Sequence, residues 1–306
     1  MAETKYGHLV KTVSPFGDHG PGSYRQGTQM DREFLGYDLH IRYGTFYNSG
    51  NIEPFETQVC DYDQVMVWIG TDTVDLGYLG AEIDYCMGEE REKHRITTST
   101  AVRIPKGIPH GPARIGPMSD RFILMTISMT PKPAGKPAAL DKPEGSYATW
   151  RQAKYTKYLG HGLAFTRNGP WHYGPLNPDT HCGAITNIDG VEFNFNMSYE
   201  SMNRAPYRFA PIPDRPHVHP YTEFLIFMGC DCSDLSKFPA EVELCMGKEM
   251  ETHLITKPTI AVQPQGFPHI PLRVLRQDGS WIFMVLRPWG HGTEVGGDSS
   301  STALPK

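Results

Sequence analysis

The segment AEVELCMGKEMETHLITKPTIAVQP, residues 240–264, has a close copy earlier in the chain, AEIDYCMGEEREKHRITTSTAVRIP, residues 81–105. Twelve of the 25 aligned positions are identical, at a constant offset of 159 and without a gap. The same offset relates His110 to His269 outside this window. Because self-similarity at a fixed period indicates a duplicated structural unit, the chain is predicted to fold as two homologous domains in tandem.

The apolar segments within each half are short and typical of strands. VMVWIG and RFILMTISM in the first half, like EFLIFMG and WIFMVL in the second, are rich in Val, Ile, Phe and Trp. Gly, Pro and Asp interrupt them, a pattern that predicts an all-β fold with a barrel or sandwich in each half. The best helix candidate covers residues 145–159. The predicted boundaries are 1–130 for the first domain, 131–150 for a linker rich in Pro and Gly, 151–290 for the second domain and 291–306 for a disordered polar tail.

Composition excludes several classes of partner. The 306 residues carry a formal net charge of -5 from interspersed acids and bases, without the block of Lys and Arg that binds nucleic acid. No apolar run approaches the roughly 20 residues that span a bilayer, and the first residues lack the apolar core of a secretion signal. Six cysteines are too few for a disulfide framework in a chain of this length. These features predict a cytoplasmic protein with neither nucleic acid nor membrane as a partner.

Good metal ligands gather at the start of one apolar run, in PHVHPYTEFLIFMG, residues 216–229. His217 and His219 are one residue apart, so on a strand both point to the same face, and Glu223 can join them through a bend or bulge. The turn sequence PQGFPHIP then places His269 at the start of another strand. Imidazoles with a carboxylate suit Fe(II), Mn(II), Ni(II), Cu(II) or Zn(II) and leave coordination positions open.

The order HxHxxxE followed by PxGxxH resembles the two motifs of the cupin superfamily, whose members are small barrels of jelly-roll type. Together with the duplication, it makes the chain similar to a bicupin over roughly residues 54–128 and 213–287. The resemblance implies dioxygenase, decarboxylase, lyase or isomerase activity, and it implies that the metal ligands are His217, His219, Glu223 and His269.

The first half lacks this ligand set. At the offset of 159, its corresponding residues are Gln58, Cys60, Gln64 and His110. Because amides are neutral and weak donors, we predict one divalent ion per chain, held in the second domain, and a first domain that supports packing or shapes an interface. Residues repeated in both halves, where only one half can bind metal, are interpreted as structural: His94 and His253, Cys86 and Cys245, Tyr62 and Tyr221, Arg114 and Arg273.

The predicted function is that of a metal-dependent enzyme, with Fe(II) the favoured ion and dioxygenation of a small organic acid or phenolic compound the favoured reaction. Arg208 and Arg215 precede the ligands and are candidates to pair with an anionic small-molecule substrate, while Trp281 is a candidate pocket wall. Two alternatives stay open. One is a non-oxidative decarboxylase, lyase or isomerase that uses the ion as a Lewis acid; the other is a non-catalytic small-molecule binding protein. A homodimer is compatible with either.

Overall fold

The computed structural model describes residues 4–16, 25–140, 143–149, 153–161, 164–166, 180–185, 195–203, 205–208, 216–231 and 233–289. Within these ranges its regular secondary structure consists almost entirely of antiparallel strands, which confirms the all-β prediction. Among the same residues, no helix has the length and apolar character needed to cross a membrane. The predicted disordered tail, residues 291–306, lies outside the described part of the chain.

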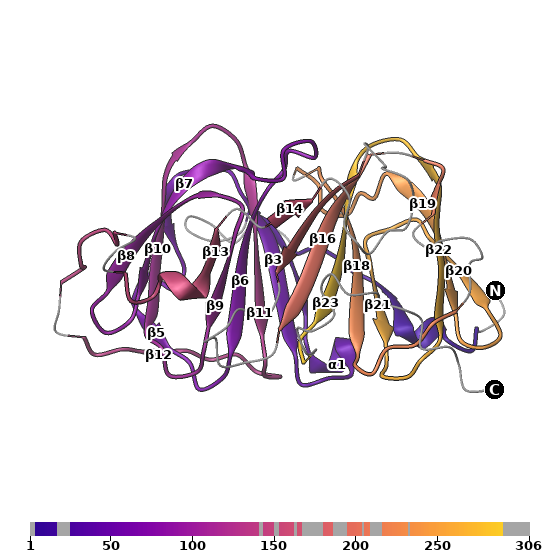
Figure 1. Cartoon of the computed structure of the whole chain (residues 1–306), viewed down its shortest axis with the longest axis horizontal. Helices are drawn as coiled ribbons and strands as arrows, with labels where there is room; N and C mark the ends of the chain where they lie inside the picture. The colour runs from indigo at the N-terminus through magenta and orange to yellow at the C-terminus, as the bar shows by residue number, and fades with distance from the viewer. Residues whose placement is uncertain are drawn as a thin grey trace. The chain divides into compact units, whose positions relative to one another are not determined.

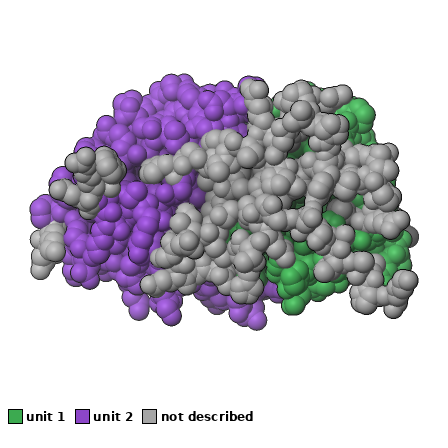
Figure 2. All heavy atoms as spheres, viewed as in Figure 1, with its two compact units in different colours: residues 1–14, 164–187, 194–306 green, residues 15–163, 188–193 purple. Residues whose placement is uncertain are grey.

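The chain forms two compact units, coloured separately in Figure 2. The N-terminal barrel comprises residues 15–163 and 188–193, and the C-terminal barrel comprises residues 1–14, 164–187 and 194–306. These limits differ from the predicted boundaries, because the first residues of the chain join the C-terminal barrel and residues 151–163 join the N-terminal one.

Two sheets form the N-terminal barrel (Figure 1). The first has the order β13 (Leu159–His161), β9 (Thr100–Ile104), β6 (Gln64–Gly70), β11 (Phe122–Ser128), β3 (His40–Phe46) and β2 (Gln26–Met30). The second has the order β12 (Lys136–Pro137), β5 (Gln58–Val59), β10 (His110–Met118), β7 (Tyr78–Met87) and β8 (Glu92–Thr98), with β4 (Gly50–Ile52) paired to β10. Alternate residues of both sheets point inward to form a single core, which includes Trp68, Ile83, Tyr85, Val102, Phe122 and Leu124.

The C-terminal barrel repeats this plan. Its first sheet has the order β1 (Val10–Thr12), β21 (Thr259–Gln263), β18 (Glu223–Gly229), β23 (Trp281–Arg287), β16 (Asn196–Met202), β15 (Thr180–Ile185) and β14 (Ala164–Thr166). The second has the order β17 (Tyr207–Arg208), β22 (His269–Gln277), β19 (Ala240–Met246) and β20 (Glu251–Ile255). Strands β18, β21, β22 and β23 begin 159 residues after β6, β9, β10 and β11, so the sequence repeat corresponds to a repeat of structure.

The described helices are single turns: η1 (Gly7–Leu9), α1 (Arg32–Leu35) and η2 (Thr156–Tyr158). The helix predicted over residues 145–159 was therefore wrong in its described part, residues 145–149 and 153–159, where η2 alone is helical. Tyr147 instead bridges to Lys93 on β8, and the chain near it runs extended along the sheet. Tertiary contacts override the local helix propensity of this segment.

In each barrel, a tyrosine packs against the equivalent turn, after β7 in one and after β19 in the other, and hydrogen-bonds to it. In the N-terminal barrel, the hydroxyl of Tyr155 donates to Glu90 (2.7 Å), its backbone N–H donates to Glu92 (3.1 Å), and its ring lies against Gly88, where a Cβ atom would overlap it. In the C-terminal barrel the equivalent contacts are made by Tyr6 with Glu249, Glu251 and Gly247. Both glycines have positive φ, 77° and 74°, which glycine adopts readily. These contacts attach η1 and η2 to their barrels.

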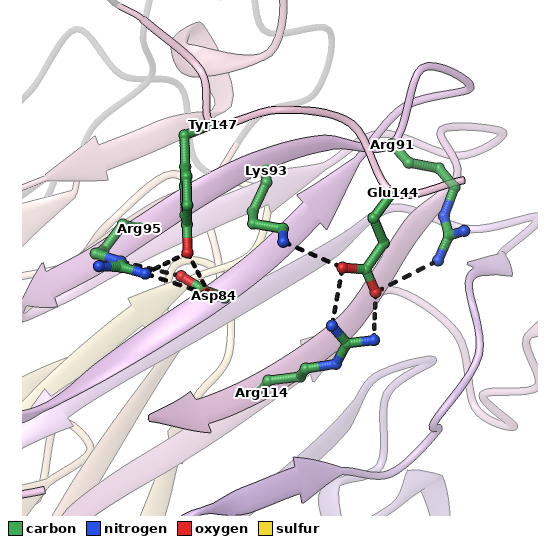
Figure 3. Close-up of polar contacts among 7 residues, drawn as sticks. All are labelled: Asp84, Arg91, Lys93, Arg95, Arg114, Glu144 and Tyr147. Carbon is green, nitrogen blue, oxygen red and sulfur yellow. Dashed lines mark hydrogen bonds and ion pairs between the residues drawn. The ribbon is translucent and has the colours of Figure 1, made fainter. Parts of the chain in front are cut away.

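Ion pairs fix the end of the linker to the N-terminal barrel (Figure 3). The carboxylate of Glu144 pairs with Arg114, with Lys93 (3.2 Å) and with Arg91 (3.7 Å), and its side chain is 18% exposed. Burial alone would raise the pKa of Glu144, but hydrogen bonds from Lys93 and Arg114 outweigh burial and hold that pKa below its ordinary value. The linker is therefore an ordered strap along β7, β8 and β10 in this region.

Candidate metal centre

A pair of backbone hydrogen bonds brings the separated ligand motifs together. The N–H of His217 donates to the carbonyl of His269 (3.2 Å), and the N–H of His269 donates to the carbonyl of His217 (3.1 Å). The N–H of Gly266 donates to the carbonyl of His219 (2.8 Å), so the turn before β22 packs against the strand-like segment before β18. Gly266 has φ 71°, a conformation that the tight turn requires and that glycine adopts without a Cβ penalty. The histidines are thus placed by the backbone.

The side chains of His217, His219 and His269 converge. Each offers a ligand atom, and these atoms all lie within 4.8 Å of one another. The ring centroid of His217 lies 4.7 Å from that of His219 and 4.5 Å from that of His269. Nδ1 of His269 is 3.2 Å from the carbonyl of Phe267, a contact that favours the tautomer with the proton on Nδ1 and Nε2 as the ligand atom. This donor set fits a divalent transition metal ion.

Glu223 is the fourth member of the cluster. Its Oε2 lies 3.4 Å from Nε2 of both His219 and His269, while its Oε1 accepts a hydrogen bond of 2.6 Å from Nε of Arg287. Burial would raise the pKa of Glu223, but the charge of Arg287 and the nearby histidines hold it well below its ordinary value. Burial and the neighbouring imidazoles lower the pKa of His217 to about 3. At neutral pH the cluster therefore presents a carboxylate and a neutral His217, both in the ligating form.

Three further residues complete the site, namely Arg287, Asn196 and Tyr221, and the sequence analysis assigned none of them to it. Arg287 also donates from Nη1 to Oδ1 of Asn196 (2.9 Å), so the amide orients the guanidinium. The hydroxyl of Tyr221 lies 3.3 Å from Nδ1 of His219, and the two rings stack at 5.2 Å. Tyr221 was interpreted as a residue of the barrel alone because Tyr62 matches it in the first half, yet it contacts a candidate ligand. Arg287 could have been found from the repeat, because Ser128 occupies its position in the first half.

The predicted substrate-binding residues are placed differently. Arg208 lies on β17, where it pairs in register with Arg273, and its side chain is outside the described part of the chain, as is the whole of Arg215. Trp281 begins β23 and is fully buried against Phe227, Phe238 and Phe283, at the opposite end of that strand from Arg287. Its contacts are those of a core residue, so we do not retain it as a wall of the metal centre.

In the N-terminal barrel the equivalent positions form an uncharged network. Sγ of Cys60 lies 4.0 Å from Nε2 of His110, and Nε2 of Gln64 donates to Oγ of Ser128 (3.0 Å). Burial raises the pKa of Cys60 and lowers that of His110, so both groups are neutral at pH 7. The arrangement replaces the Glu223–Arg287 ion pair by an amide and a hydroxyl.

No family model matches the chain, and no curated protein sequence matches it either. Solved structures do resemble it. A variant of oxalate decarboxylase OxdC from Bacillus subtilis has a TM-score of 0.60 and 8% identity, covering 93% of this chain and 78% of that one. The chain has the bicupin fold. A second variant of that decarboxylase has a TM-score of 0.59 at 10% identity, with the same coverage. AerE from Microcystis aeruginosa has a TM-score of 0.53 at 8% identity, covering 92% of this chain and 100% of that one. These similarities confirm the predicted cupin fold, which the chain repeats in two tandem barrels.

Proposed function

We propose that the C-terminal barrel holds one divalent metal ion and that the chain is a metal-dependent enzyme acting on a small organic acid. The ligands in this proposal are His217, His219, His269 and Glu223. The observation that carries it is the convergence of three imidazoles on a buried carboxylate whose other oxygen is held by Arg287. Four protein ligands leave two positions free on a six-coordinate ion, which suits a substrate that binds through two oxygens.

The charges of the site support an anionic substrate. Arg287 balances Glu223, so a bound divalent ion would keep its full charge of +2 in surroundings where the Glu223 side chain is 3% exposed. A net positive charge that is poorly screened by water favours ligands with anionic oxygens, such as a carboxylate or an ionised phenol. Small organic acids and phenolic acids meet this requirement.

The bound ion would supply Lewis acidity and, if it is iron, redox chemistry. The protein groups have separate tasks. Glu223 is engaged on both oxygens and is therefore a ligand rather than a free proton acceptor, while Arg287 and Asn196 fix its orientation. Tyr221 holds the ring of His219 in place. Among reactions, dioxygenation with Fe(II) is our first choice. Non-oxidative decarboxylation is the second, favoured by the structural similarity to oxalate decarboxylase.

The test is to load the full-length protein anaerobically with Fe(II) or Mn(II) and to follow oxygen uptake and carbon dioxide release with oxalate and with a panel of phenolic acids. Oxygen consumed in step with product supports the dioxygenase, whereas carbon dioxide release without net oxygen uptake supports the decarboxylase. His217→Ala is expected to abolish turnover, and His110→Gln, at the equivalent face of the N-terminal barrel, is expected to retain it. Absence of turnover with every compound, together with equal ligand affinity for wild type and Glu223→Ala, would instead indicate a binding protein.

A further inference from the structure

The N-terminal barrel encloses a cavity of about 410 Å³ at the face where the C-terminal barrel has its metal ligands. A cavity of this size is within the range of small-molecule sites. Its wall includes the counterparts of the four ligands and, from the start of the linker, Pro133 and Gly135. Loss of the ligand set has therefore not been accompanied by filling of the barrel with larger side chains, although protein interiors are otherwise close-packed.

The strand register arranges the cavity wall in layers. At the mouth, Ser128 of β11 pairs with His40 of β3 and with Gln64 of β6. One layer deeper, Thr126 pairs with Arg42 and with Met66, and the layer after that contains Leu124. All the residues named in these layers line the cavity. The two strand partners of Leu124, Trp68 and Gly44, do not. The wall thus changes from polar at the mouth to apolar inside, with one cation at the boundary.

Arg42 is the feature that sets the charge of this cavity. Among the described lining residues, Arg42 is the only Arg or Lys and Glu53 the only Asp or Glu. Burial lowers the pKa of His40 and His110 and raises that of Cys60, which favours the neutral form of all three. Glu53 is exposed, whereas Arg42 is half-buried, with its guanidinium 5.7 Å from the centroid of the Phe16 ring. Arg42 also lines an adjoining hollow with Asp31 and Glu33. A half-buried guanidinium facing a cavity is suited to a carboxylate.

The deeper wall is suited to an apolar body. It is formed by Phe46, Ile52, Met66, Tyr85 and Leu124. Phe46 stacks on Phe122 with ring centroids 5.3 Å apart, which closes the barrel below the cavity. The amides of Gln58 and Gln64 lie at the polar end and can bond to hydroxyl or carbonyl substituents.

We propose that the N-terminal barrel is a second, metal-free binding site for a small organic anion, with its carboxylate on Arg42 and an aromatic or aliphatic body against Phe46 and Leu124. The site does not depend on the proposed metal centre, because no candidate ligand of that centre contributes to it. It gives the barrel without the ligand set a role of its own, as a receptor for an organic acid.

The test uses benzoate and its neutral isostere benzamide as probes. Binding is measured by isothermal titration calorimetry on the full-length, metal-free protein carrying His217→Ala and His269→Ala, so that the metal centre cannot contribute. One benzoate per chain is expected, with benzamide about tenfold weaker. Arg42→Met is expected to weaken benzoate about tenfold or more and to remove the difference between the probes, whereas Arg95→Met, a matched loss of an exposed cation on the same barrel, is expected to change neither.

Two further measurements locate the probe. Ala113→Leu adds volume to the cavity wall and is expected to abolish binding of both probes. In the protein with Arg42 intact, benzoate is expected to slow alkylation of Cys60 by iodoacetamide, read peptide by peptide, more than benzamide does; this readout is independent of whether Arg42→Met folds. Absence of benzoate binding, or binding unchanged by Ala113→Leu without protection of Cys60, would overturn the proposal. Either result leaves the proposal for the metal centre unaffected, since two of its four ligands are removed in the tested protein.

Discussion

Replacing Arg287 with methionine is expected to destabilise the metal-free C-terminal barrel by about 3 kcal/mol, because it leaves the carboxylate of Glu223 buried without its cation. The two groups are 2.6 Å apart, and their side chains are 15% and 3% exposed. Two unit charges about 4 Å apart interact by about 4 kcal/mol at an effective dielectric of 20, which sets the scale of the loss. Glu223→Gln is expected to cost a similar amount. The double variant is expected to cost less than the sum of the two by about 2 kcal/mol, because neither charge is then left alone.

The pH dependence of this loss has a definite sign. The pKa of Glu223 is held below its ordinary value, so the ion pair contributes stability above about pH 4.3, the pKa in the unfolded chain, and that contribution falls as the pH drops through the folded pKa. The difference between wild type and Arg287→Met is therefore expected to be full at pH 7 and to shrink below about pH 4. Urea unfolding with a chelator present, combined with hydrogen exchange of the β18 and β23 amides, measures it.

Ser128→Ala provides the matched control, because Ser128 is the equivalent residue of the N-terminal barrel and pairs with an uncharged Gln64. Loss of this neutral hydrogen bond is expected to cost about 1 kcal/mol, without dependence on pH between 4 and 7. Equal costs for Arg287→Met and Ser128→Ala, or additive single variants of Arg287 and Glu223, would refute the view that an ion pair organises the metal centre.

Three further outcomes are expected. His217→Ala is expected to reduce bound metal from one ion per chain to none by elemental analysis, while His110→Gln leaves it at one; a retained ion in the first variant would place the metal elsewhere. Tyr221→Phe is expected to weaken metal affinity about tenfold, because His219 loses an orienting contact, and a competition titration with a chelator measures this. Glu144→Gln is expected to speed proteolysis in the linker at low salt, with a smaller effect at high salt, where screening already weakens the ion pairs of Glu144. Equal cleavage of wild type and variant at low salt would contradict the view that these ion pairs hold the linker against the barrel.

The repeat made much of the fold predictable. An offset of 159 in sequence placed six strands of one barrel on six of the other, and it identified which half carries the ligand motifs. Local pattern was sufficient here because each motif lies within a few residues of a strand end, so spacing alone brings His217 and His219 to one side. The convergence of His269 on them was implied by the PxGxxH motif and the cupin resemblance, and it is present in the structure.

The domain boundaries were not predictable in this way. Tyr6 and Tyr155 make equivalent contacts but are 149 residues apart, so the offset of the repeat does not relate them. Each lies far in sequence from the glutamates that bind it. Arg287 and Asn196 were missed for a similar reason. They become partners through the pairing of β23 with β16, 91 residues apart in sequence, and no local sequence spacing indicates this contact.

The two barrels differ in where a partly buried arginine lies relative to the face that carries the metal ligands or their counterparts. In the C-terminal barrel, Arg287 lies in the mouth layer beside Glu223, and the next layer holds Leu225, Val285 and Ser198. In the N-terminal barrel, the mouth layer is uncharged and Arg42 lies one layer deeper, at the position equivalent to Ser198. In the C-terminal barrel, Arg287 and Glu223 neutralise each other. In the proposed metal centre, the positive charge that attracts the substrate would therefore come from the metal ion. In the proposed N-terminal site, Arg42 in the cavity wall would itself attract the organic anion. The two proposed sites would thus differ in whether a metal ion or an arginine supplies the positive charge, and Arg42→Ser is expected to weaken benzoate binding in the N-terminal barrel about tenfold or more without altering metal content.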